Sequence, residues 1–227
     1  MGISLPRWVW VGAVALSAIA GMVNAVGFLG FEHQALSHLS GTTTQLGAAL
    51  AHGDWQAVTD LWGLLLAFCL GATASGLIVQ DAALHLGRRY GVALGLESLL
   101  LLAAVPLFKQ HQILGAWLAA AACGMQNALA TTYSGAIVRT THLTGMFTDL
   151  GIGLGHLLRG MPLPFRRLTL SALIITGFLA GGIAGAWLFT HFTYDALLAP
   201  AALTGSAGIG YVAYVSWHSR RVRSRPR

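Results

Sequence analysis

Long runs of apolar residues constrain this chain more than any other feature of its sequence. Six runs are strongly apolar, at about 8–30, 58–80, 90–108, 112–132, 168–190 and 196–217. A helix of about 20 residues, rising about 1.5 Å per residue, crosses a hydrocarbon core of roughly 30 Å. Backbone groups inside a bilayer must bond within the segment, and no run alternates as a barrel strand does. The sequence therefore predicts an all-α integral membrane protein with six strong spans surrounded by membrane lipid.

Charged residues are scarce and unevenly placed. They make up 9% of the chain, against roughly 25% in soluble proteins. Five arginines gather in the tail 218–227, namely Arg220, Arg221, Arg223, Arg225 and Arg227. A basic tail directly after an apolar span is typical of a cytoplasmic tail near anionic lipid rather than of a nucleic-acid-binding arm. We therefore expect no nucleic-acid partner.

The cysteines and histidines give no sign of a metal or other cofactor. Cys69 and Cys123 both lie inside apolar runs without ligand spacing, and we expect them to be small buried hydrophobic residues. None of the nine histidines pairs at i, i+4 with a nearby Glu or Cys. We expect neither a disulfide, nor a metal site, nor a cofactor.

Two further segments, about 34–52 and 136–158, are weaker candidates for spans. The second contains Arg139, His142, Asp149 and His156. One Arg or Asp near the centre of a spanning helix costs roughly 2.5 to 3.5 kcal/mol on insertion scales. These segments are therefore expected to face protein or water, either as broken helices or as re-entrant helices.

An internal repeat connects the weak segments to the strong ones. Residues 21–25 (GMVNA) match 124–128 (GMQNA), and residues 38–41 (HLSG) match 142–145 (HLTG). The spacing from Asn to His differs by one residue between the two copies. A third match pairs Phe68 and Gly71 with Phe178 and Gly181. The chain 1–227 is thus predicted to be a single membrane domain made of two halves, 8–108 and 112–217.

The distribution of positive charge favours an inverted repeat. If both weak segments cross the membrane, the eight spans leave Arg88, Arg89 and Arg139 outside, so ten of the thirteen Lys and Arg residues are inside. If both are re-entrant, the six spans leave only Lys109 outside, so twelve of the thirteen are inside. Three spans plus a re-entrant element form an odd unit, whose second copy is inverted. Both arrangements place the N- and C-termini in the cytoplasm.

The repeated Ser/Thr-Gly motifs are the first candidate for a site. We expect Ser40 and Thr144 to be N-caps of two short helices whose N–H groups and partial positive charge face a polar or anionic solute. Small residues that only let helices pack closely would explain one copy equally well. The candidate solute-binding residues are Asn24, His38, Ser40, Gly41, Thr44, Asn127, His142, Thr144, Gly145 and Thr148.

Amides and acids at membrane depth are the second candidate. Asn24 and Asn127 are each expected either to bond a carbonyl of the broken segment or to line a solute pathway. Glu97 and Asp149 are the proton-coupling candidates, because intramembrane acids are commonly functional. The alternatives are that Asp149 pairs with Arg139 or a histidine, and that Glu97 faces Arg88 or Arg89 at the interface.

The stretch from Gly21 to Gly53 resembles the YoaK family of bacterial membrane proteins, a family of unknown function. The resemblance rests on Asn24-Ala25 followed by Gly27-Phe28-Leu29, and on Leu39-Ser40-Gly41 followed by Thr43, Thr44 and Leu46-Gly47. The second Leu-Thr-Gly copy, the glycine-rich spans and the chain length also fit. The resemblance implies a bacterial inner-membrane location, and it transfers neither a substrate nor a catalytic residue.

These observations favour a transporter or channel for a small polar or anionic solute, with its site between the two halves. A scaffold or regulator of another membrane protein is the alternative. A membrane-embedded enzyme is less favoured, because neither a Ser-His-Asp order with an elbow motif nor paired carboxylates occur in the sequence. We therefore expect that the chain is not an enzyme. A homodimer is compatible with the small size of the chain.

Overall fold

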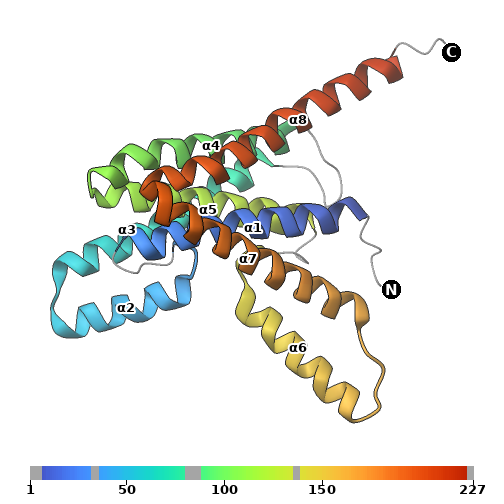
Figure 1. Ribbon diagram of the computed structural model, residues 1–227, viewed down its shortest axis with the longest axis horizontal. Coiled ribbons are helices and arrows are strands. Elements are labelled where there is room, and N and C mark those ends of the chain that lie inside the picture. The colour runs from blue at the N-terminus through green and yellow to red at the C-terminus, as the bar shows by residue number, and fades with distance from the viewer. Residues whose placement is uncertain (1–6, 32–35, 80–87, 135–138, 224–227) are drawn as a thin grey trace.

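The chain folds into long helices joined by short connections (Figure 1). The computed structural model describes residues 7–31, 36–79, 88–134 and 139–223, and every regular element in these ranges is helical. The elements are α1 (Arg7–Gly30), α2 (Leu39–His52), α3 (Trp55–Ile78), α4 (Arg88–Lys109), α5 (Ile113–Tyr133), α6 (Leu143–Leu158), α7 (Phe165–Phe192), the 3₁₀ helix η1 (Thr193–Leu197) and α8 (Leu198–Arg223). The predicted all-α class is confirmed for the described residues.

Helix length separates the elements into two groups. The helices α1, α3, α4, α5, α7 and α8 have 21 to 28 residues each. Five ranges of the described chain are long and apolar enough to cross a membrane, and the last of them, Phe165–Trp217, contains α7, η1 and α8. The protein is therefore a helical membrane protein.

The helices α2 and α6 are short. They have 14 and 16 residues, which gives about 21 and 24 Å at 1.5 Å per residue. Neither length reaches the roughly 30 Å of a hydrocarbon core. These two helices occupy the segments whose sequence was the least apolar.

The long helices alternate in direction along the long axis of the molecule, and both chain ends lie at the same end of the bundle (Figure 1). Helix α2 packs on α3, and α6 packs on α7. The α2–α3 hairpin and the α6–α7 hairpin point toward opposite ends of the molecule, while the N-terminal ends of α2 and α6 face its middle (Figure 1).

Glycines bring α1 and α7 into close contact. Gly21 of α1 lies against the backbone of Phe178, and Gly181 of α7 lies against the backbone of Ala18. A side chain at either glycine would occupy the space of the neighbouring carbonyl. Without a hydrophobic driving force between helices in lipid, such close backbone packing is a main source of helix association.

The same contact joins α5 to α3. Gly124 of α5 lies against the backbone of Phe68, and Gly71 of α3 lies against the backbone of Ala121. Gly21 and Gly124 are matched in the sequence repeat, as are Phe178 with Phe68 and Gly181 with Gly71. Residues that match in sequence therefore make matching contacts in two different helix pairs.

The two cysteines differ in their surroundings. Cys123 of α5 is buried, as expected, whereas Cys69 of α3 is exposed. Its neighbours Leu66 and Leu70 are also exposed, at 54% and 68%. This face of α3 is apolar and turned outward, as a lipid-facing surface is, so the predicted burial of Cys69 inside protein is wrong.

We predict that Gly21→Ala destabilises the protein by about 1 to 3 kcal/mol, because even a methyl group forces α1 away from α7. Gly12→Ala, on the same helix, is the matched control. A methyl group there meets no atom within 4 Å, and Ala favours a helix over Gly by up to about 1 kcal/mol. The measurement is the free energy of unfolding in detergent micelles. Equal stability of the two variants would contradict the close contact.

Candidate functional site

A layer of buried polar side chains lies where two apolar clusters meet on α4 and α5. One cluster contains Leu101 of α4 and Cys123 of α5, and the other contains Leu94 of α4 and Met125 of α5. Glu97 and Ser98 lie between the clusters on α4, and Gln126 follows Met125 on α5. All three side chains are buried. Buried polar groups at this depth need partners within the protein, and most of these groups have them.

Asn24 holds the segment that leads into α2. Its side-chain Nδ2 donates to Ser37 Oγ at 2.6 Å and to the carbonyl of Ala20 at 2.9 Å, and its Oδ1 accepts from the backbone N–H of Ser37 at 3.1 Å. Both Asn24 and Ser37 are buried. The Asn24 amide therefore fixes the chain at Ser37, one residue before His38, which is the N-cap of α2. Asn24 is bonded to the segment before α2, but through the N–H and Oγ of Ser37 and not through a carbonyl of that segment as predicted.

In the second copy the corresponding amide belongs to Gln126. Thr140 Oγ1 donates to Gln126 Oε1 at 3.3 Å, which holds the segment that leads into α6. Gln126 Nε2 in turn donates to Glu97 Oε1 at 3.0 Å. The sequence match indicated Asn127, but its buried Oδ1 has no hydrogen-bond partner among the described residues. Thr140 follows Asn127 by 13 residues, as Ser37 follows Asn24, yet it bonds Gln126, so the spacing did not predict this change.

The sequence analysis did not identify Ser37, Gln126 or Thr140. Gln126 stands where the first copy has Val23, so a second polar residue beside Asn127 was visible in the sequence. Thr140 and Ser37 lie in the irregular segments before the two short helices, where periodicity gives no guide to side-chain direction.

The N-caps of the short helices are His38 and His142, so the prediction that Ser40 and Thr144 are N-caps is wrong. Each helix begins two residues earlier than expected, which puts the hydroxyl residue inside the first turn. Neither histidine side chain caps its helix. The His38 ring lies 5.9 Å from the ring of Phe178 on α7, measured between centroids. The start of α2 is therefore placed beside the middle of a long apolar helix.

The hydroxyl residues of the two motifs lie on exposed faces. Thr44 Oγ1 donates to the carbonyl of Ser40 at 3.0 Å, and Thr148 Oγ1 donates to the carbonyl of Thr144 at 3.0 Å. These four residues and Gly41 are exposed, whereas Gly145 is half-buried beneath the ring of His142. Their hydroxyl groups do not join the buried layer, and their use by one shared solute site stays a prediction.

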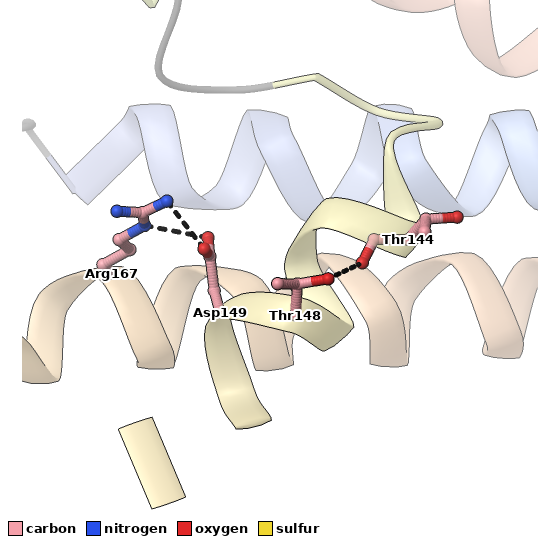
Figure 2. A network of polar contacts seen from close by, with 4 residues as sticks. All are labelled: Thr144, Thr148, Asp149 and Arg167. Carbon is pink, nitrogen blue, oxygen red and sulfur yellow. Dashed lines mark hydrogen bonds and ion pairs between the residues drawn. The ribbon is translucent and has the colours of Figure 1, made fainter. Parts of the chain in front are cut away.

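Asp149 forms an ion pair with Arg167 in the α6–α7 hairpin (Figure 2). Arg167 Nε donates to Asp149 Oδ2 at 2.8 Å, and its Nη2 donates to Oδ1 at 2.6 Å. The partner is therefore neither Arg139 nor a histidine. Arg167 is the partner of Asp149 because α6 folds back on the first turns of α7. A two-bond contact of this kind fixes the side-chain geometry as well as the charge.

Glu97 lies inside the bundle with 2% of its surface exposed. Glu97 accepts a hydrogen bond from Gln126 inside the bundle. The alternative, an interfacial position facing Arg88 or Arg89, is therefore not the one observed. The second oxygen of Glu97, Oε2, is buried without a hydrogen-bond partner among the described residues. In the part of the chain that the structure describes, no group of three or more His, Cys, Asp and Glu side chains is placed to hold a metal ion.

The chain belongs to the DUF1275 family, a family of proteins of unknown function, whose family model matches residues 12–210. The resemblance to the YoaK family is thereby confirmed, because that family is part of this one. No curated protein and no solved structure matches the chain.

We predict that Asn24→Leu and Asn127→Leu differ in their effect on stability. The first leaves the N–H and hydroxyl groups of Ser37 buried without their partner, at a cost of about 1 to 3 kcal/mol. The second removes an amide oxygen that has no partner among the described residues, so its cost is smaller. The measurement is reversible unfolding in mixed micelles. Equal losses would show that the two amides have the same role.

Proposed function

We propose that this DUF1275 protein is a channel or secondary transporter of the bacterial inner membrane that moves a small polar or anionic solute. The observation that carries the proposal is that two helices shorter than the membrane begin beside buried amides in the middle of the bundle. Both chain termini are on the cytoplasmic side in this proposal.

A helix that begins inside a bilayer is costly, because its first N–H groups have no water to bond. Transporters use such ends to bind polar or charged groups of a solute, since the exposed donors and the partial positive charge lie at the middle of the membrane. Here the segments before α2 and α6 are each fixed by a buried amide. This support keeps two otherwise unfavourable helix ends in place.

The exposed face of α2 also supports a solute path. From Ser40 to Ala48 the exposed residues are small or polar: Ser40, Gly41, Thr43, Thr44, Gln45, Gly47 and Ala48. Hydrocarbon solvates such a face poorly, whereas water or a polar solute solvates it well. The outward face of α3, with Leu66 and Leu70 exposed, has the opposite character.

We further infer that the two halves form an inverted repeat with six spans and two re-entrant helices. The support is the matching glycine contacts of α1 with α7 and of α5 with α3, which relate the first helix of each half to the third helix of the other. The opposite directions of the α2–α3 and α6–α7 hairpins agree with this symmetry (Figure 1).

Charge supports the orientation. Arg159, Arg166 and Arg167 lie at the α6–α7 turn, at the end of the bundle where both termini lie (Figure 1). At the opposite end, Lys109 is paired with Asp195 at 2.7 Å. The positive-inside rule places the arginine-rich end in the cytoplasm. That the chain is not an enzyme and that it forms a homodimer stay predictions.

We predict that the protein in proteoliposomes carries at least one solute from a panel of small anions and neutral polar molecules. Thr44→Leu and Thr148→Leu should each reduce that flux by about tenfold or more, the effect of losing about 1.4 kcal/mol of favourable interaction with the solute. The measurement is solute uptake with matched protein-to-lipid ratios.

Thr176→Leu is the matched control for both variants. Thr176 is an exposed threonine on α7 whose hydroxyl also donates to the carbonyl four residues earlier, that of Ala172 at 2.8 Å. Its replacement should leave flux unchanged. If no solute is carried, or if all three variants behave alike, the proposed pathway is wrong and the scaffold alternative becomes the better one.

We predict that single cysteines at positions 52 and 110 both react with a membrane-impermeant thiol reagent from the periplasmic side. His52→Cys and Gln110→Cys are made in a chain whose Cys69 and Cys123 are replaced by Ala. In the six-span arrangement both positions are outside, whereas eight spans would place both inside. Arg159→Cys is cytoplasmic in either arrangement and is the control. Labelling of positions 52 and 110 from the cytoplasm alone would contradict the re-entrant helices.

A further inference from the structure

Glu97 is the acid that the structure describes deepest in the bundle. It lies in the middle of α4, between the two apolar clusters. Neither of the two ion pairs among the described residues includes it. Its Oε1 accepts the hydrogen bond from Gln126, while its Oε2 is buried without a hydrogen-bond partner among the described residues. An un-ionised carboxyl group has this asymmetry, with one acceptor oxygen and one hydroxyl oxygen.

Among the described residues, no Lys, Arg or His forms an ion pair with Glu97. The thiol of Cys123 on α5 and the phenol of Tyr90 on α4 interact electrostatically with it. Tyr211 of α8 packs against Tyr90, with ring centroids 5.4 Å apart. Arg89 lies about two turns away on α4, roughly 12 Å along the axis, and Lys109 at the other end of that helix is paired with Asp195. An isolated carboxylate in such surroundings is strongly disfavoured unless other groups rearrange to bond it.

The hydrogen bonds of Glu97 continue to the start of α6. Gln126 donates to Glu97 and accepts from Thr140, which lies three residues before Leu143, the first residue of α6. When Glu97 loses its proton, both oxygens become charged acceptors and attract further donors. The donors in this chain of bonds are the second N–H of Gln126 and the hydroxyl of Thr140. Turning either of them toward Glu97 disturbs the bond that fixes Thr140.

We propose that Glu97 binds and releases a proton, and that Gln126 and Thr140 transmit this change to the N-terminal end of α6. The proton is taken from water onto Oε2 and returned to water on release, so no other reactant is needed. The physiological meaning of this proton step rests on the proposed function. It adds to that function a proton-dependent step at one of the two short helices. The start of α2, held by Asn24, has no such connection among the described residues.

The first test is an infrared difference spectrum of the full-length protein in lipid between acidic and alkaline pH. The wild type should show the C=O stretch of a protonated carboxyl group that disappears at alkaline pH and shifts in D₂O. Glu97→Gln should lose this band, whereas Asp149→Asn, which removes an acid paired with Arg167, should keep it. An unchanged band in Glu97→Gln, or no such band in the wild type, would overturn the proposal.

The second test measures the link to α6 by amide hydrogen exchange of residues 139–146, corrected for the intrinsic effect of pH. Exchange in the wild type should be faster when Glu97 is ionised by about fivefold, the effect of losing one hydrogen bond. Glu97→Gln and Thr140→Val should both abolish this difference, while Thr140→Val keeps the infrared band. Residues 36–42 are the internal control and should exchange alike in the wild type and in Glu97→Gln.

A pH response of residues 139–146 that persists in Glu97→Gln would contradict the role of Glu97. Neither readout requires a solute, so the two proposals fail separately. If no solute flux is found but the infrared band and the exchange response are both present, the transporter proposal is rejected and the proton site is kept. If flux is found without either of them, only the proton site is rejected.

Discussion

Two buried amides hold in place the chain segments that precede the short helices. A helix that starts within hydrocarbon leaves N–H groups without water, and an irregular chain that leads to it adds further unbonded groups. Asn24 and Gln126 each bond the segment that precedes one of the two short helices, at Ser37 and Thr140. The close glycine contacts of α1 with α7 and of α5 with α3 then hold the long helices that carry these amides. The two amides are therefore the contacts that fix the chain just before α2 and α6.

The two copies of this arrangement are alike in position and different in chemistry. The first ends at neutral groups, because Asn24 bonds Ser37 and the carbonyl of Ala20. The second continues through Gln126 to the carboxyl group of Glu97. In our proposal the first copy is a fixed support, and the second copy responds to a proton. In that proposal only the second arrangement can change its charge, so one short helix gains two states while the other stays fixed.

The sequence predicts much of the fold, because long apolar runs in a membrane admit few structures. The expected span at 58–80 corresponds to α3, Trp55–Ile78, and the weak segment 136–158 contains α6, Leu143–Leu158. The site is predicted less well. Thr140 bonds Gln126 although it follows Asn127 by 13 residues, as Ser37 follows Asn24, so spacing along the chain does not predict which amide is bonded. The Asp149–Arg167 pair depends on how α6 folds back on α7, and no local pattern encodes that contact.

The central claim is that α2 and α6 begin at the middle of the membrane and end at its surface. The most direct test is the depth of spin labels placed one at a time along residues 40–52 and 144–158, measured in lipid by their accessibility to oxygen and to a water-soluble relaxation agent. The account predicts that depth decreases steadily from the first residue of each helix to the last. A profile that is shallow at both ends and deepest in the middle would show two crossing helices and contradict the account.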